Sequence, residues 1–385
     1  MGFIIILFIA AIFTAGYAVL IETYRKWFVK VPLFAAANTN VPVDGTTFSI
    51  IIPARNEASI IHECLVSVLS QSYPSNRFEV ILVDDHSTDD TALIAEGLQQ
   101  QYANLKVIRL QEILKGKSLN SYKKKAIEVA VQYASYDWIV TTDADCMVND
   151  QWLQTFHAFI LQKDPVFIAA PVAFTNTGSF VSLFQSLDFM SLQGITAAAV
   201  HHRFHSMCNG ANLAYSKKVF AAVGGFKGID NIASGDDMLL MHKIFKMYPK
   251  QVAFLLSQQA IVKTEPMDSW AAFFNQRIRW ASKADKFEDK RIFSVLLFIY
   301  LYNCSFAILL IASFWQPYFL LLWLAMIACK TLIELRFLFP VARFFDAQKL
   351  LWWFPVMQPV HIGYTIVAGW LGKFGKYTWK GREVK

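Results

Sequence analysis

Four long apolar runs stand at the two ends of this chain, and they constrain its fold more than any other feature. One precedes a more polar middle region and three follow it. The runs cover residues 3–21, 292–314, 317–333 and 352–371. Each approaches or exceeds the roughly 20 residues that a helix needs to cross the hydrocarbon core of a bilayer. The chain is 55% hydrophobic, which is high for a soluble domain. We therefore expect membrane helices on both sides of one soluble domain.

The first run is expected to remain on the protein as an anchor. It lacks the basic segment that precedes the apolar core of a signal peptide, and it is longer than such a core. Positive charges follow this run and also precede the second one, at Arg25, Lys26, Lys30, Lys283, Lys286, Lys290 and Arg291. Because cytoplasmic loops are enriched in Lys and Arg, the middle region should face the cytoplasm. The expected location is the inner or plasma membrane of a bacterium.

The fourth run leaves two arrangements open. Pro355, Pro359 and Gly363 weaken it as a membrane helix. A full crossing would also place the basic tail, residues 373–385, outside the cytoplasm, against the positive-inside rule. A re-entrant or interfacial segment avoids this conflict, and we slightly favour it.

Charge and cysteine content narrow the classes of partner. The net charge of +7 comes mostly from residues beside the apolar runs, which suits an anionic lipid surface. We find no basic stripe with interleaved aromatic residues, so no nucleic-acid partner is expected. The five cysteines form no CxxC pair, and they predict neither a zinc site nor a disulfide framework. This agrees with a reducing cytoplasm.

The middle region alternates strand-like and helix-like patterns. Strands are expected at residues 48–52, 78–83, 105–110 and 138–142, and helices between them at 58–71, 91–101 and 118–133. This order predicts an α/β fold with a doubly wound, mostly parallel sheet. A further strand is expected at 167–173 and an amphipathic helix at 180–201. The expected domains are an anchor (1–22), a linker (23–47), a cytoplasmic domain with interfacial helices (48–283) and a membrane region (284–385).

Paired carboxylates, Asp143 and Asp145, directly follow the fourth strand. Open α/β sheets bind ligands at the carboxyl ends of their strands. Mg²⁺ and similar hard cations prefer such oxygens and usually share them with substrate phosphates. The pair therefore indicates a metal-bound diphosphate, although Asp also favours ordinary turns.

Other polar segments occupy comparable positions. Residues 53–57 follow the first strand and residues 84–89 the second, where they fit either a nucleotide site or helix caps. Lys115 and Lys117 precede a helix and fit either a phosphate or a solvated loop. Asp236 and Asp237 begin a helical run, where the helix dipole stabilises acids or one of them acts as a general base. Residues 276–280, Gln-Arg-Ile-Arg-Trp, fit diphosphate recognition or an interfacial anchor.

Five motifs in register resemble those of the processive-type, membrane-bound branch of the family 2 glycosyltransferases, over about residues 48–280. They are Pro-Ala-Arg-Asn-Glu (53–57), Val-Asp-Asp-His-Ser-Thr-Asp (83–89), Asp-Ala-Asp (143–145), Gly-Asp-Asp (235–237) and Gln-Arg-Ile-Arg-Trp (276–280). The resemblance implies the nucleotide-diphospho-sugar transferase (GT-A) sheet of that family with flanking transmembrane helices.

The resemblance also implies roles for individual residues. It places nucleotide contacts at Pro53, Arg55, Glu57 and Asp84 or Asp85, and a donor-side lysine at Lys117. It implies that Asp143 and Asp145 bind the donor diphosphate and Mg²⁺ or Mn²⁺, chiefly through Asp145. Gln276, Arg279 and Trp280 match the motif that closes over the donor diphosphate. Asp237 matches the catalytic base, whereas the role of Asp236, which stands where the family commonly has Glu, stays open.

The implied activity is a metal-dependent, inverting hexosyl transfer from a UDP- or GDP-linked sugar. A lipid acceptor is favoured, because four apolar runs are too few for a polysaccharide channel in one chain. The tail, Trp379-Lys380-Gly381-Arg382, also resembles lipid- and carotenoid-directed members. The alternatives are a polysaccharide synthase subunit with a glycan acceptor and a non-catalytic membrane scaffold.

Overall fold

The protein is described by a computed structural model that covers nearly the whole chain. The described residues are 2–36, 45–116, 119–175, 178–204, 207–232, 234–282, 289–375, 377–379 and 382–384. They form two compact units. We call the first the helical unit, which comprises Met1–Val31, Phe174–His205 and Pro266–Lys385, and the second the sheet unit, which comprises Pro32–Ala173 and Ser206–Glu265.

The sheet unit is built on a seven-stranded sheet in the order β3-β2-β1-β4-β8-β6-β9. Neighbouring strands run parallel except at β8, which is antiparallel to both β4 and β6. The mostly parallel α/β sheet expected from the sequence is therefore confirmed. The strands are β1 (Phe48–Ala54), β2 (Phe78–Asp84), β3 (Leu105–Arg109), β4 (Trp138–Thr141), β6 (Phe167–Ala169), β8 (Leu213–Ser216) and β9 (Val252–Phe254).

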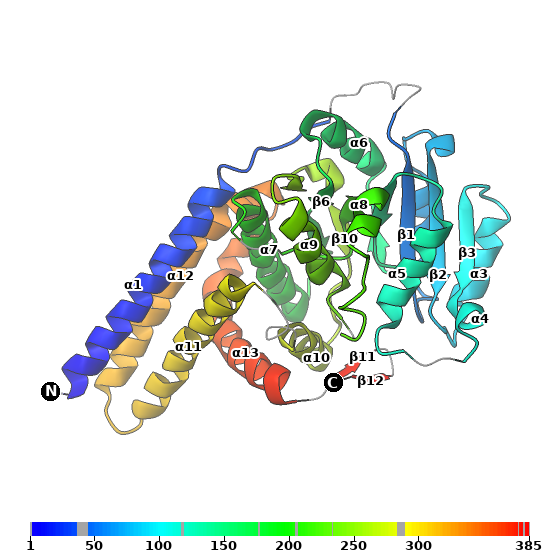
Figure 1. Ribbon diagram of the computed structural model, residues 1–385. Helices are drawn as coiled ribbons and strands as arrows, with labels where there is room; N and C mark the ends of the chain where they lie inside the picture. The colour runs from blue at the N-terminus through cyan, green and yellow to red at the C-terminus, as the bar shows by residue number, and fades with distance from the viewer. Residues whose placement is uncertain are drawn as a thin grey trace. The chain divides into compact units, whose positions relative to one another are not determined.

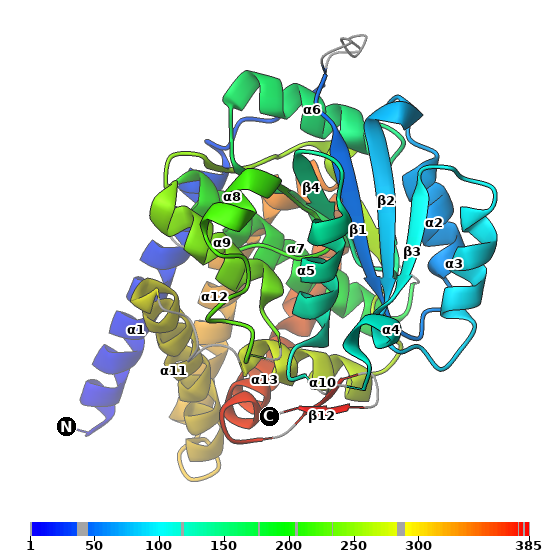
Figure 2. The ribbon, with the colours of Figure 1, turned by 45° about the vertical axis from the view of Figure 1, so that its right-hand side comes forward.

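Hydrophobic burial on both faces explains why these segments form central strands. Phe48, Ile50, Ile51 and Ile52 of β1 have no exposed surface, as expected when helices cover both faces of a parallel sheet. Figure 2 shows α2 and α3 on one side of β1, β2 and β3, with α5 on the other. The helices of this unit are α2 (Ile61–Leu69), α3 (Thr91–Gln99), α4 (Leu110–Leu114), α5 (Tyr122–Tyr133), α6 (Trp152–Lys163), α8 (Lys217–Ala222) and α9 (Asp236–Met247), with 3₁₀ turns η1 (Ser75–Arg77) and η2 (Gln258–Ala260).

The order of the strands creates a switch point between β1 and β4. The chain moves from β1 through β2 to β3 and then returns to place β4 on the opposite side of β1. Crevices for ligands form at the carboxyl ends of strands where such a reversal occurs. Arg55 and Asp143 follow the two strands that flank this point.

Two sequence expectations for the sheet unit need correction. The strand expected at residues 167–173 is two short strands in different sheets, because Pro171 interrupts it and has no N–H for a ladder. Its second part, β7 (Val172–Phe174), joins a small sheet in the order β5-β10-β7 with β5 (Cys146–Met147) and β10 (Val262–Thr264). The helix expected from residue 118 begins at Tyr122, and α4 was not expected at all.

The helical unit contains the apolar ends of the chain. In Figure 1 α1 runs alongside α12, and the two helices are in contact. The elements are α1 (Gly2–Phe28), α7 (Phe180–His201), α10 (Trp270–Ala281), α11 (Lys290–Ala312), α12 (Tyr318–Phe344), η3 (Gln348–Trp353), α13 (Phe354–Phe374) and a hairpin of β11 (Tyr377–Trp379) and β12 (Arg382–Val384). The helix α1 extends beyond the expected anchor boundary at residue 22.

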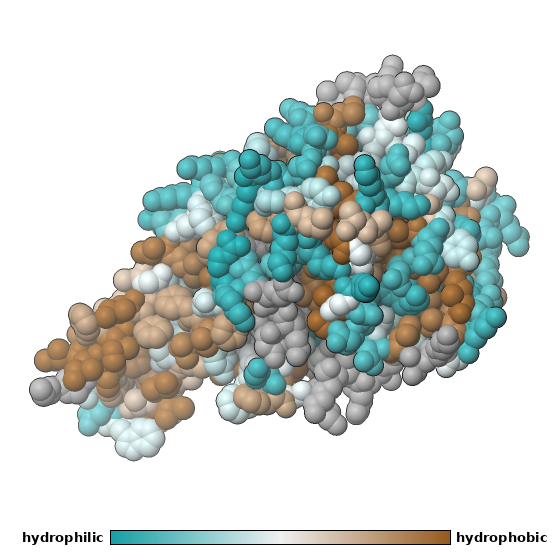
Figure 3. Space-filling view, in the orientation of Figure 1, coloured by the Kyte–Doolittle hydropathy of each residue, from teal (hydrophilic) through white to brown (hydrophobic). Residues whose placement is uncertain are grey.

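Three helices are long and apolar enough to cross a membrane: Ile4–Phe28, Lys290–Ala312 and Tyr318–Phe344. The surface over α1, α11 and α12 is largely hydrophobic in Figure 3, whereas hydrophilic residues predominate over the sheet unit. α13, which contains most of the fourth run, does not belong to this set of three within the described residues.

A polar cluster joins these helices internally. The Lys330 side chain is fully buried on α12 and donates hydrogen bonds to Glu334 and Gln358, each at 2.8 Å. Tyr17 of α1 and Gln358 of α13 donate to the same Glu334 carboxylate. A buried charge is tolerated when it is paired and hydrogen-bonded. Lys330, which interrupts the third apolar run, therefore belongs to a buried hydrogen-bond network that connects α1, α12 and α13.

Candidate functional site

Polar residues of the sheet unit gather where β1, β2 and β4 end. Ala54 at the end of β1 pairs in register with Asp84 at the end of β2, and the Asp85 N–H donates to the Ala54 carbonyl at 2.7 Å. β4 lies on the other side of β1. The segments after these strands, which the sequence indicated as candidate sites, therefore meet at one edge of the sheet.

The loops after β1 and β2 are joined by their own side chains. Arg55 donates from Nη1 to the carbonyl oxygens of Asp85 and His86, at 2.7 and 3.0 Å. The Glu57 N–H donates to Thr91 Oγ1 at 2.8 Å. Asn56 and His86 both adopt positive φ, 52° and 56°, a region that Asn and His enter more readily than most residues. Arg55 thus has a structural role in holding the second loop, and Pro53 lies inside β1.

Asp84 and Asp85 are almost fully buried, with 2% and 3% of their surface exposed. Asp85 Oδ1 lies 2.9 Å from His86 Nδ1, and the Ser87 N–H donates to Asp84 Oδ2 at 3.3 Å. Asp84 Oδ1 has no hydrogen-bond partner within the described part of the chain. Because a buried, unsatisfied carboxylate oxygen is costly, Asp84 is suited to accept a hydrogen bond from a ligand.

Asp143 and Asp145 occupy a turn directly after β4. The Cys146 N–H donates to the Asp143 carbonyl at 3.2 Å, and the turn leaves both carboxylates partly exposed. Cys64 and Cys146 are buried beneath this turn. The Cys64 thiol donates to the Asp143 carbonyl at 3.7 Å. The turn therefore rests on buried side chains and carries its two carboxylates near the switch point.

Lys123 connects the Asp143 turn to the Asp236–Asp237 motif. Its Nζ lies 2.6 Å from Asp143 Oδ1 and 3.5 Å from Asp236 Oδ2. Burial alone would lower the pKa of Lys123, but the carboxylates of Asp143, Asp236 and Asp237 outweigh that effect and raise it. The ammonium group therefore stays charged at neutral pH and stands between the two acidic motifs.

Lys123 was not expected at this site. The resemblance pointed to Lys117, which lies outside the described residues. A signal was present in the helical periodicity of this segment. Lys123 stands three and four residues before Ala126 and Ile127, which are buried on α5. Residues at that spacing share one face of a helix. Lys123 is therefore expected on the same face of α5 as these buried residues, which pack against the sheet.

Asp236 and Asp237 form the first turn of α9. Gly235 before them adopts φ 77°, a conformation that glycine adopts at no steric cost. The Gly210 N–H donates to Asp237 Oδ2 at 3.1 Å, and the Met238 N–H donates to Oδ1 at 2.7 Å. Thr141 of β4 donates to the Gly210 carbonyl at 2.9 Å, so Asp237 is held in place through the strand that precedes Asp143.

Lys124 secures the loop before these acids. This fully buried lysine donates to the Ser234 carbonyl at 2.9 Å and to the Ile232 carbonyl. Neighbouring lysines of α5 thus hold both the acids and the loop that presents them. Lys123 thus brings Asp143 close to Asp236, which is followed directly by Asp237.

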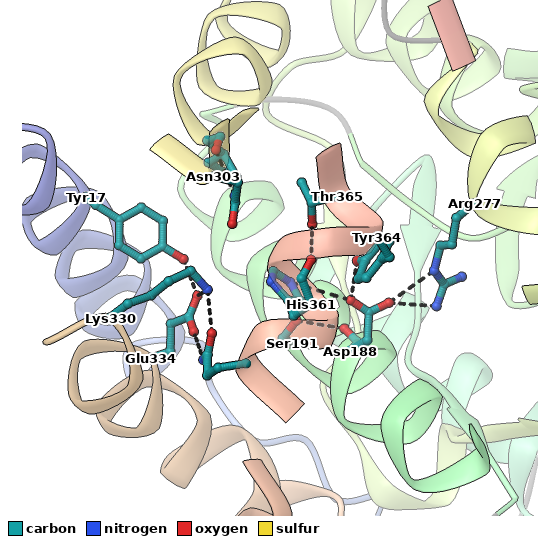
Figure 4. A network of polar contacts seen from close by, with 12 residues as sticks. Tyr17, Asp188, Ser191, Arg277, Asn303, Lys330, Glu334, His361, Tyr364 and Thr365 are labelled. Atoms are coloured by element: carbon teal, nitrogen blue, oxygen red, sulfur yellow. Dashed lines mark hydrogen bonds and ion pairs between the residues drawn. The ribbon is translucent and has the colours of Figure 1, made fainter. Parts of the chain in front are cut away.

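Gln276, Arg279 and Trp280 belong to the helical unit, on α10. Arg277 beside them is buried and forms an ion pair with Asp188 of α7, with Nη2 and Oδ2 2.7 Å apart. Figure 4 shows this pair together with Tyr364 of α13. Ser269 caps α10 by accepting a hydrogen bond from the Ala272 N–H at 3.3 Å. The motif is therefore carried by a capped helix with a buried ionic contact.

The carboxylates near the switch point fit a metal ion that they share with a ligand. Within the described residues no group of three or more His, Cys, Asp or Glu side chains is arranged to hold a metal ion. Asp143 and Asp145 supply carboxylate oxygens from a single turn. Mg²⁺ characteristically takes one or two protein carboxylates and completes its shell with water and phosphate oxygens, and these residues fit that pattern.

Comparison with known protein families identifies matching models over most of the chain. The model of "Glycosyl transferase family 2" matches residues 49–224. The model of "Glycosyl transferase family group 2" matches residues 138–370. Together they include the polar motifs of both units.

Similar sequences come from both archaea and bacteria. Glycosyltransferase AglE of Haloferax volcanii is 28% identical over 192 residues, which is 49% of this chain and 58% of that protein. Beta-monoglucosyldiacylglycerol synthase of Synechocystis sp. is 26% identical over 259 residues, 65% of this chain and 50% of that protein. The chain thus spans about half the length of these relatives.

A solved structure with the same fold is the mannosyltransferase PcManGT of Pyrobaculum calidifontis in complex with GDP-Man and Mn²⁺. It matches with a TM-score of 0.56 and 17% identity, over 92% of this chain and 98% of that one. The similarity confirms the fold of the nucleotide-diphospho-sugar transferases that was expected from the motifs.

Proposed function

The chain belongs to the family 2 glycosyltransferases, and from this premise we propose that it transfers a sugar from a UDP- or GDP-linked donor to a membrane lipid. The observation that carries the proposal is the ion-pair bridge of Lys123, which joins Asp143 of the diphosphate motif to Asp236 of the base motif. Sugar transfer requires these two groups at one place, because the bond to the leaving diphosphate breaks where the acceptor attacks.

Asp237 is the proposed general base. It accepts the proton of the acceptor hydroxyl while that oxygen forms a bond to the anomeric carbon and the bond to the nucleoside diphosphate breaks. The displacement inverts the configuration of that carbon and involves no covalent enzyme intermediate. The N–H groups of Gly210 and Met238 orient the carboxylate, as effective proton transfer requires a positioned base. Asp236 faces Lys123 instead, and we assign it the supporting role.

The donor is assigned to the groups around the switch point. Asp84 and Asp85, with the joined loops of Arg55 and Glu57, would contact the nucleoside. Lys123 would offset charge on the leaving diphosphate. On the resemblance of their motif to that of the family, we also assign Arg279 to this charge and Gln276 and Trp280 to closure over the donor. Asp145 and Asp143 would hold Mg²⁺ or Mn²⁺, which when bound supplies further positive charge against the same oxygens.

A lipid acceptor is supported by the helical unit and by one relative. Three helices have the length and composition to cross a membrane, and they would anchor the sheet unit at the cytoplasmic surface by the positive-inside rule. A relative from Synechocystis is named as a beta-monoglucosyldiacylglycerol synthase. We place α13 at the membrane interface, in line with the prolines near its start.

The function is tested with the purified full chain in lipid nanodiscs. The protein is incubated with Mn²⁺ and a panel of UDP- and GDP-sugars, and the lipid extract is analysed by mass spectrometry. A glycosylated lipid formed with one donor is the expected result. Nucleotide release that requires an added oligosaccharide would favour a glycan acceptor. No transfer with any donor or acceptor would overturn the proposal.

Asp145→Ala is expected to weaken metal-dependent donor binding by at least about tenfold, because a carboxylate that supports a metal site typically contributes this much or more. The measurement is calorimetric titration of the nucleotide sugar with and without Mn²⁺. Asp150→Ala changes an exposed carboxylate nearby and serves as the control. A Mn²⁺ effect on affinity that is unchanged in Asp145→Ala would remove Asp145 from the metal site.

A further inference from the structure

Arg277 stands inside the Gln-Arg-Ile-Arg-Trp motif, but the proposed donor contacts leave it without a role. Its side chain is 4% exposed, so it is a buried cation on α10. Nε and Nη2 donate to Asp188 Oδ2 of α7, at 3.1 and 2.7 Å. Two nitrogen atoms of the guanidinium therefore bind one oxygen of Asp188, whose side chain is 2% exposed.

The other side of the guanidinium faces the motif itself. Nη1 donates to the Gln276 side-chain oxygen at 2.8 Å. The guanidinium carbon also lies 4.1 Å from the centre of the Trp280 ring, within the range of a cation–π contact. Arg277 therefore contacts two of the three motif residues to which donor closure is assigned, while its ion pair fixes its own position.

Asp188 is held in turn by α13. Tyr364 donates its hydroxyl proton to Asp188 Oδ1, and His361 Nε2 lies 3.8 Å from the same oxygen. Figure 4 shows these side chains converging on Asp188 from α13, opposite Arg277. A chain of contacts thus runs from α13 through Asp188 and Arg277 to Gln276 and Trp280.

Close backbone approach strengthens the contact between α13 and α10. A Cβ atom built on Gly372 of α13 would come within 2.6 Å of the Ala281 Cβ at the end of α10. No side chain fits at this position without displacing one of the helices. Both ends of the motif segment are therefore constrained by the same helix.

We propose that Asp188 and Arg277 are a positioning pair that sets the orientation of Gln276 and Trp280 for transfer. The inference rests on the proposed function, because it assigns these two residues to donor closure. A purely structural pair would contribute to stability alone. A positioning pair contributes to turnover, since a misplacement of about 1 Å in a reacting group can lower a rate about 100-fold.

The test replaces the pair by an uncharged one, Asp188→Leu with Arg277→Met. Buried ion pairs can often be exchanged for apolar residues of similar volume without loss of stability, so the thermal midpoint should change by only a few degrees. The contacts to Gln276 and Trp280 are lost, and we expect kcat to fall about 30-fold while the donor KM changes by less than about threefold, because Lys123 and Arg279 are retained. Tyr364→Phe, which removes one hydroxyl, should lower kcat about threefold.

The matched control uses the pair of Asp289 and Arg291 in the same unit, which has similar two-point geometry at 2.9 and 2.8 Å. The Arg291 side chain is 47% exposed, whereas that of Asp289 is buried. Asp289→Asn with Arg291→Met should retain the wild-type kcat. A folded Asp188→Leu/Arg277→Met variant with wild-type kcat would overturn the inference. If that variant does not fold, wild-type kcat in both Arg277→Lys and Tyr364→Phe would overturn it, and a loss in both supports it.

Failure of the proposed function is recognised separately. It is indicated if the wild-type chain transfers no sugar from any donor. In that case there is no kcat to compare, and the inference about the pair falls with the proposed function. If the wild-type chain does transfer a sugar, wild-type kcat in the folded uncharged variant overturns the inference alone and leaves the proposed function standing.

Discussion

Asp237→Asn is expected to lower kcat by about 10²–10⁴-fold, the contribution usual for a positioned general base, with little change in the affinity for the nucleotide donor. The substitution preserves the shape of the side chain. Its amide oxygen can still accept the Gly210 N–H that Asp237 accepts at 3.1 Å. What is lost is the capacity to take a proton from the acceptor hydroxyl.

The experiment measures kcat from released nucleoside diphosphate and donor affinity by calorimetry on the same preparations. Asp230→Asn alters an exposed carboxylate before the same helix and should behave as wild type. Asp236→Asn is the informative comparison, because Asp236 faces Lys123 and should affect donor binding and kcat together. Near-normal turnover in Asp237→Asn would exclude Asp237 as the base.

Local patterns were sufficient for much of the fold. The helix expected at residues 180–201 is α7 with those bounds, and the strand expected at 78–83 is β2 with one further residue. These elements have strong periodicity or continuous apolar runs, which are the most reliable sequence signals. Errors arose where a break depends on context, as at Pro171 between β6 and β7.

The partners of charged residues were the part that sequence patterns did not reveal. Lys330 looked like an interruption of an apolar run, yet it donates hydrogen bonds to Glu334 and to Gln358 on another helix. Tyr17, from the opposite end of the chain, donates to the same Glu334 carboxylate. Asp188 and Arg277 are likewise far apart in sequence. Pairing over such separations depends on helix packing, and no local period encodes it.

The candidate site shows the same division. Motif order identified the acids, since Asp143 and Asp237 each stand at the end or start of a predictable element. The cation between the acids was missed, because a Gly-Lys sequence at residues 116–117 drew attention to Lys117. Only the packing of α5 against the sheet brings Lys123 to Asp143 and Asp236.

Lys123→Met is accordingly expected to lower kcat/KM for the donor by about 10²–10³-fold, the range seen when one preorganised electrostatic group is removed from an active site. The loss has two physical causes. Asp143, Asp236 and Asp237 would face one another without a neutralising cation, and like charges in a partly buried site repel. The anionic donor would also meet a more negative site.

Lys125→Met is the matched control, two residues along the same helix. Lys125 pairs with Glu128 at 2.7 Å in the next turn and is 34% exposed, a kind of contact that contributes little. Steady-state kinetics with varied donor, together with calorimetric donor affinity, should leave this variant unchanged. Lys123→Arg retains the charge and should recover part of the loss. Equal kcat/KM in Lys123→Met and Lys125→Met would mean that the bridge between the two acidic motifs has no part in transfer, and the proposed site would then lack its central contact.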